Sequence, residues 1–140
     1  MFKGYIASER RRTQRRTFKN KEYSLSNSKL LFGKCGIKLL NKGVLVVREL
    51  IPLKLFLMKT FKGIAKVWTR FLPQKVITKK PEEVRMGKGK GKLFSWIAPV
   101  KAGMILFEFS DFVMTPELRI KLNIVMGKLS VKSKLIKKLI

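Results

Sequence analysis

The stretch of this chain with the clearest chemical character is the alternation of glycine with basic residues between Val84 and Gly91. Glycine adopts positive φ readily and carries no Cβ, so such a loop lets the backbone come close to a phosphate. Lysine and arginine in the same loop supply charge and donors. The sequence has neither the Gly-Lys-Ser/Thr ending of a P-loop nor a dinucleotide fingerprint. The pattern favours a basic finger that lies on a polyanion; the alternative is a solvated hairpin tip.

The charge of the whole chain points to the same class of partner. Lys and Arg total 33 of the 140 residues against 8 Asp and Glu, a formal net charge of +25. A compact body with this charge repels itself unless an anionic partner neutralises it. Nucleic acid is the commonest such partner, and an anionic membrane surface is the second candidate. The 46% share of hydrophobic residues is enough for a packed core.

Catalytic and metal chemistry have little support in the residue types. The chain contains no histidine and one cysteine, Cys35, which excludes a Cys/His metal site, an intramolecular disulfide and a His-based triad. Cys35 is expected to be a small packing residue, since no base is present to activate it. We expect no catalytic residue, no metal and no cofactor. An RNA-modifying enzyme would need a cofactor site that the sequence does not show.

The most apolar stretch, residues 43–58, is interrupted by charged residues and by Pro52. It therefore lacks the roughly 20 apolar residues that a helical membrane span needs. We expect no membrane insertion. Residues 44–61 with their basic flanks leave binding to a membrane surface as an alternative function.

Residues 1–28 form a basic arm in which Tyr5, Phe18 and Tyr23 lie between the charges. Guanidinium groups pair with phosphates and rings stack on bases, so this pattern suits RNA. The alternative is a solubilising tail. We expect a single domain over residues 29–140, with an RNA-facing loop at 79–92.

Strand and helix signals alternate along this domain. The predicted class is α+β, with two helices packed on one side of a mostly antiparallel sheet. The stretches expected to contain strands are 30–40, 65–72, 76–78, 93–100, 104–109 and 131–136. A short turn separates 93–100 from 104–109, which predicts that these two strands pair as a hairpin.

The first helix is expected within residues 44–61, where Pro52 would clash with the carbonyl of Arg48. That helix either begins near Ile51 or bends at the proline. The second begins at residues 115–117, where Thr is a good N-cap, Pro suits the first turn and Glu complements the dipole. Residues expected in the core between helix and sheet are Trp68, Trp96, Phe107 and Leu122.

A family resemblance adds to these expectations. The run from Ile77 to Gly91, Ile-Thr-Lys-Lys-Pro-Glu-Glu-Val-Arg-Met-Gly-Lys-Gly-Lys-Gly, closely resembles the signature of the bacterial family of large-ribosomal-subunit protein sixteen. Further segments similar to that family's motifs are 12–21, 32–38, 66–73, 96–98, 100–108 and 128–134. The resemblance thus covers nearly the whole chain.

The resemblance implies an α+β protein bound to large-subunit ribosomal RNA beside the aminoacyl-tRNA site, where it shapes RNA and supports assembly without being the catalyst. The implied partners are that RNA, tRNA in the aminoacyl site and neighbouring ribosomal proteins, with no stable homo-oligomer. The residues assigned to ribosomal RNA are Arg10, Arg11, Arg12, Arg15, Arg16, Lys19, Lys21, Lys34, Lys38, Arg70, Lys79, Lys80, Lys132 and Lys134. The loop assigned to tRNA and the peptidyl-transferase region is Arg85, Met86, Gly87, Lys88, Gly89, Lys90 and Gly91.

The chain departs from the family's pattern in its first helix, which is Leu- and Phe-rich rather than Ala- and Arg-rich, and at Cys35, where an aromatic residue is usual. The segment 111–115 also lacks the usual Gly-Val turn. Heavy use of Lys, Ile, Leu and Phe with scarce Ala suits an AT-rich genome. We expect an organelle-encoded protein of a mitochondrial ribosome, with a plastid or a low-GC bacterium next.

Overall fold

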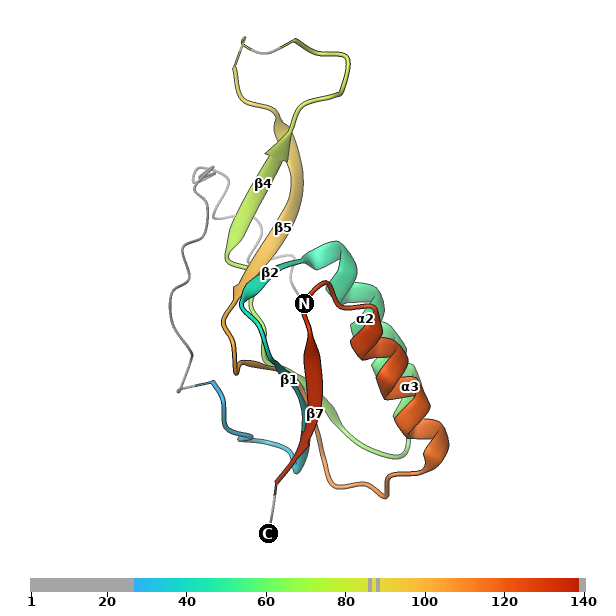
Figure 1. Cartoon of the computed structure of the whole chain (residues 1–140). Helices are drawn as coiled ribbons and strands as arrows, with labels where there is room; N and C mark the ends of the chain where they lie inside the picture. The colour runs from blue at the N-terminus through green and yellow to red at the C-terminus, as the bar shows by residue number, and fades with distance from the viewer. Residues whose placement is uncertain (1–26, 86, 88, 139–140) are drawn as a thin grey trace.

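A computed structural model describes residues 27–85, 87 and 89–138 of the chain (Figure 1). Apart from Asn27 and Ser28, the predicted arm lies outside the described residues. The elements, in chain order, are β1 (Cys35–Leu39), β2 (Gly43–Val46), α2 (Val47–Thr60), β3 (Val67–Thr69), β4 (Lys75–Lys79), β5 (Lys92–Val100), β6 (Ile105–Phe109), α3 (Pro116–Gly127) and β7 (Ser133–Lys137). The α+β class expected from the sequence is confirmed.

The strands divide between two antiparallel sheets, whereas a single sheet was expected from the sequence. A four-stranded sheet has the order β3-β6-β1-β7, and a three-stranded sheet has the order β2-β5-β4. β5 therefore pairs with β2 and β4, and β6 pairs with β1 and β3. The predicted hairpin between residues 93–100 and 104–109 is wrong, because these strands belong to different sheets.

Backbone hydrogen bonds explain why the short turn between β5 and β6 does not close a hairpin. The turn contains Gly103 with φ +84°. Its amide donates to the Leu39 carbonyl at 2.8 Å, and the Leu39 amide donates to the Met104 carbonyl at 2.8 Å. The turn has its own hydrogen bond from the Met104 amide to the Lys101 carbonyl at 3.3 Å, but its bonds to Leu39 join it to the end of β1. It therefore carries the chain from one sheet to the other.

The two helices lie side by side on one face of the four-stranded sheet (Figure 1). The core forms between them and that sheet. Its fully buried members include Ile37, Leu39, Leu50, Leu57, Phe61, Phe107, Phe109 and Leu122. Cys35 is buried there as well, which confirms its expected packing role. Phe107 and Leu122 are fully buried as expected. The expectation for Trp68 and Trp96 is wrong, because both are only partly buried and neither belongs to this core.

Helix α2 begins at Val47 and continues through Pro52, so a start near Ile51 is wrong. The proline lacks the N–H that would bond the Arg48 carbonyl, but its ring is exposed. On the opposite side Leu50, Leu53 and Leu57 recur at helical spacing and are buried. Burial of this apolar stripe holds the helix together across the missing bond.

Helix α3 starts where the sequence predicts. The Thr115 hydroxyl accepts a hydrogen bond from the Leu118 amide at 3.4 Å, Pro116 occupies the first turn and Glu117 is the acidic residue of that turn. No helix among residues 27–85 and 89–138 is long and apolar enough to cross a bilayer.

Candidate nucleic-acid interface

The basic loop is the tip of a hairpin formed by β4 and β5, which projects beyond the helices and the four-stranded sheet (Figure 1). β5 has nine residues, of which the last four, Ile97–Val100, pair with β2. Its first residues pair only with β4, in a register that sets Lys79 opposite Lys92. The body of the protein thus holds one end of β5, and the other end carries the tip outward.

Three glycines of the tip have two different functions. Gly87 and Gly89 adopt φ of +105° and +91°, and a Cβ at either position would meet no atom within 4 Å. They turn the backbone in a region that L-residues disfavour and leave it accessible. Gly91 is different, since a Cβ there would lie 2.7 Å from the carbonyl carbon and oxygen of Lys79. It closes the loop against the opposite strand.

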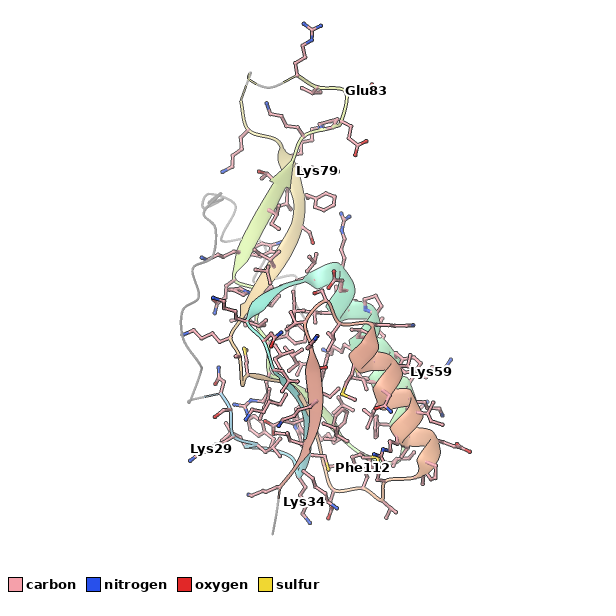
Figure 2. All side chains as sticks on the ribbon, viewed as in Figure 1. Lys29, Lys34, Lys59, Lys79, Glu83 and Phe112 are labelled. Atoms are coloured by element: carbon pink, nitrogen blue, oxygen red, sulfur yellow. The ribbon has the colours of Figure 1, made fainter. Side chains whose placement is uncertain are left out.

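Positive charge is concentrated along this hairpin. Residues 75–92 contain seven basic and two acidic residues. Arg85 and Lys90 are exposed at the tip. The Lys80 ammonium donates to the Gly87 carbonyl, and the Lys79 ammonium lies 3.3 Å from the Glu82 carboxylate. Figure 2 shows Lys79 where the strands end and Glu83 further along the loop.

Two basic residues beside the strands of the hairpin, Arg48 and Lys92, were not assigned to RNA from the sequence. The Arg48 guanidinium lies 4.5 Å from the centre of the Phe94 ring and donates to the Phe94 carbonyl at 2.9 Å. It joins the start of α2 to β5. Lys92 is exposed opposite Lys79. Lys92 could have been assigned from the sequence, because it belongs to the run of basic residues between 79 and 92. The contact between Arg48 and Phe94 could not, because the two residues are 46 positions apart in the chain.

A second group of candidates lies on and beside β1 and β7, the last two strands in the order of the four-stranded sheet. Lys38 of β1 is directly opposite Lys134 of β7, and Lys132 precedes β7 and is exposed. Lys34 precedes β1 and forms an exposed ion pair with Asp111. The hydrogen bond from the Lys34 ammonium holds the pKa of the Asp111 carboxyl below its usual value. The fold thus brings Lys38 and Lys134 together, apart from the hairpin tip.

Arg70 differs from the other described candidates because its side chain is only 9% exposed. Its Nη1 donates to Glu108 Oε1 at 2.5 Å and to the Lys29 carbonyl at 2.6 Å. Burial raises the pKa of the Glu108 carboxyl, but hydrogen bonds from Gly33, Phe32, Arg70 and Leu31 outweigh it and hold that pKa below its usual value. Glu108 was not among the residues singled out from the sequence, although a single acid in an otherwise apolar strand is a visible signal.

The sequence matches the family model of ribosomal protein L16p/L10e over residues 7–136. The chain belongs to this family.

Curated members of the L16p/L10e group include close counterparts of nearly the whole chain. The large ribosomal subunit protein uL16 of Buchnera aphidicola is 36% identical over 127 residues, which are 90% of this chain and 93% of that protein. The uL16 of Aquifex aeolicus is 42% identical over 100 residues, 71% of this chain and 69% of that protein. The uL16 of Aeromonas hydrophila is 36% identical over 121 residues, 85% of this chain and 88% of that protein.

Membership of the L16p/L10e family makes the chain a ribosomal protein rather than an enzyme, as expected from the sequence. Ribosomal RNA and other ribosomal proteins are therefore its general partners. Several candidate contact residues lie outside the described residues: Arg10, Arg11, Arg12, Arg15, Arg16, Lys19, Lys21, Met86 and Lys88. The assignment of individual residues to ribosomal RNA or to tRNA stays a prediction.

Proposed function

We propose that this chain, as a structural component of the large ribosomal subunit, binds large-subunit ribosomal RNA and directs the tip of the β4–β5 hairpin towards tRNA in the aminoacyl site. In this role it supports tRNA positioning and subunit assembly, and it contributes no catalytic group. The domain organisation that we propose is a basic arm at residues 1–28 and one α+β domain at 29–140.

The observation that carries the proposal is the construction of the tip. Gly87 and Gly89 keep the backbone free of Cβ atoms in a loop that projects from the body, and Arg85 and Lys90 are exposed beside them. A backbone that is accessible and surrounded by cations suits contact with a phosphate chain. A hairpin of this length lets the tip reach RNA or tRNA at a distance from the surface that holds the body.

The remaining basic candidates fit a wider contact with ribosomal RNA. Lys132 and Lys134 lie on or beside the edge strand β7, Lys38 lies on the neighbouring strand β1, and Lys79 and Lys80 lie where the hairpin strands end. Phosphate contacts of this kind set orientation and supply salt-dependent affinity without reading sequence. The two groups together would fix the body while the tip points away from it.

Sedimentation with large ribosomal subunits in high salt tests the ribosomal part of the proposal. The tagged full-length chain should stay with the large subunit at salt concentrations that remove loosely bound basic proteins. Crosslinking from Arg85 or Lys90 then tests the finer part, and crosslinks to aminoacyl-site tRNA are expected. Release of the chain by moderate salt would contradict the first part; crosslinks only to distant RNA would contradict the second.

We further propose that the ribosome in question is mitochondrial. The support is compositional, since the chain contains only four alanines and uses Lys, Leu and Ile heavily. The relatives described above are bacterial, which fits a bacterial-type organellar protein equally well. Mass spectrometry of purified mitochondrial and cytosolic ribosomes from the source organism distinguishes the locations, and peptides of this chain should occur only in the mitochondrial fraction.

One observation favours a second function, binding to an anionic membrane surface. Ile51, Leu55 and Met58 recur along the outer face of α2 and are 44%, 61% and 52% exposed, with Lys59 and Lys62 exposed nearby. An exposed apolar stripe with basic neighbours is typical of helices that lie in the interface of a membrane. Flotation with vesicles of mixed neutral and anionic lipid, in the absence of RNA, tests this alternative. The ribosomal function predicts that the chain stays with RNA when both are offered.

A further inference from the structure

Glu108 is fully buried, and its carboxylate accepts hydrogen bonds from the backbone amides of a segment distant in sequence. Its Oε2 accepts hydrogen bonds from the amides of Phe32 at 2.7 Å, Gly33 at 2.9 Å and Leu31 at 3.2 Å. Arg70 completes the arrangement by bonding both Glu108 and the Lys29 carbonyl. We call residues 27–33 the root segment, because the predicted arm joins the body through them.

The root segment lies close against the face of the four-stranded sheet that points away from the helices. Glu108 of β6 is in register with Gly36 of β1, while its neighbours Phe107 and Phe109 join the core on the helix side. A Cβ on Gly36 would lie 2.7 Å from the Leu30 side chain, and one on Gly33 would lie 2.1 Å from the Phe109 carbonyl oxygen. Figure 2 shows Lys29 on the side away from α2 and α3.

Apolar burial in this segment is limited to Leu30, which is partly buried against Gly36. Leu31 and Phe32 are 65% and 62% exposed, and the Phe32 ring meets Trp68 only at a centroid separation of 6.2 Å. The ordered contacts are mainly polar, including a hydrogen bond from the Ile105 amide to the Asn27 carbonyl at 3.1 Å. Charge-assisted hydrogen bonds to a buried carboxylate are stronger than neutral ones. The Glu108–Arg70 pair therefore supplies the hydrogen bonds that hold the root segment at Lys29, Leu31, Phe32 and Gly33.

We propose that Arg70 and Glu108 are positioning residues for RNA binding, which hold the root segment in place and thereby set where the basic arm leaves the body. Arg70 is then not an RNA ligand itself, although its charge suggests that role in the sequence. This inference rests on the proposed function, because it presupposes that the arm binds ribosomal RNA. The Arg70 side chain is only 9% exposed and is ion-paired with a buried carboxylate, so an external phosphate has little access to it.

The substitution Glu108→Gln separates the two roles of Arg70 by the sign of its effect. If Arg70 positions the arm, loosening the root segment lowers the affinity of the full-length chain for transcribed large-subunit ribosomal RNA by about tenfold, with a flatter salt dependence. If Arg70 is an RNA ligand restrained by Glu108, the substitution releases it and binding becomes tighter. Hydrogen exchange at Leu31, Phe32 and Gly33 should accelerate in the variant, which reports the loosening directly.

Two further variants isolate the arm. In a full-length chain with Arg10, Arg11, Arg12, Arg15 and Arg16 replaced by Gln, adding Glu108→Gln should cause no further loss of RNA affinity, since the two changes act through the same contacts. A general structural defect would lower affinity in both backgrounds. Asp111→Asn is the matched control, because it makes the same change in charge at an exposed ion pair and should leave RNA binding unweakened.

The double variant Glu108→Leu with Arg70→Met is a control for misfolding caused by an unpaired buried charge. It removes both charges together, so neither is left without its partner. It should show the same fast exchange and the same arm-dependent loss of affinity. Unchanged or tighter RNA binding by Glu108→Gln, or an equal loss in the arm-neutral background, would overturn the positioning role. Failure of the unaltered chain to bind ribosomal RNA would instead contradict the proposed function.

Discussion

The hairpin tip and the root segment both depend on glycine and on charge, but in opposite ways. At the tip, Gly87 and Gly89 have open space around them and positive φ. At the root, a Cβ on Gly33, or on Gly36 of β1 where Leu30 packs, would lie less than 3 Å from atoms of other residues. The tip needs glycine for its conformation and accessibility, while the root needs it for close approach.

The tip and the root segment also differ in how their charges are compensated. Arg85 and Lys90 at the tip are exposed, and the sequence around them has few acidic residues, so their electrostatic energy depends on an external anion. Glu108 is fully buried and is compensated inside the protein by Arg70 and three backbone amides. Substitutions at the two regions should therefore separate stability from function, and four predictions test that separation from the largest expected loss of stability to the smallest.

Phe107→Ala should lower the free energy of unfolding by roughly 3–5 kcal/mol, because it removes a fully buried ring and leaves a cavity. The ring packs edge-on against Phe71 at a centroid separation of 5.7 Å. Thermal or urea unfolding measures the effect. A loss under about 1 kcal/mol would mean that the sheet and helices pack less tightly than the burial indicates.

Glu108→Gln should lower stability by roughly 2–4 kcal/mol at neutral pH, since Arg70 loses its buried counter-charge. The folded-state pKa of Glu108 is below its usual value, so its stabilisation is present above the unfolded value of about 4.3 and disappears as pH falls through the folded value. The difference between the two proteins should therefore shrink in acid. A constant difference from neutral pH to strong acid would show that the carboxylate charge is irrelevant.

Gly89→Ala should destabilise the protein by about 1–2 kcal/mol, because its φ of +91° strains any residue with a Cβ while nothing nearby clashes. Gly91→Ala is the informative comparison. There a Cβ would meet the Lys79 backbone at 2.7 Å, so we expect a larger loss and a displaced tip. Equal melting temperatures for the two variants would contradict the distinction between an open and a closing glycine.

Replacing both Lys88 and Lys90 with Ala should change stability by less than about 0.5 kcal/mol, because charged residues in a Gly-rich loop contribute little to a packed core. The same variant should weaken tRNA accommodation or late subunit maturation in ribosomes that carry it. Melting and translation assays on one preparation separate the two effects. If this variant melted as early as Phe107→Ala, the tip would be part of the packed body, and the division between tip and body would fail.

The features of this protein that depend only on neighbouring residues could be predicted from the sequence. The N-cap of α3 was predictable because Thr115, Pro116 and Glu117 act on the turn that follows them. The conformational freedom of the Gly/Lys loop and the burial of Phe107 were predictable from residue types alone. Family membership also followed from a long local run, residues 77–91, which the match over residues 7–136 bears out.

Strand partners and the state of buried charges were decided only by the tertiary structure. The turn at Gly103 looks locally like a hairpin turn, but its hydrogen bonds go to Leu39, more than sixty residues earlier, and β5 and β6 join different sheets. The partners of Arg70, which are Glu108 and the Lys29 carbonyl, were likewise not visible in its own stretch of sequence. Pairing across such sequence separations depends on which faces are buried together, and this energy belongs to the assembled core rather than to any local segment.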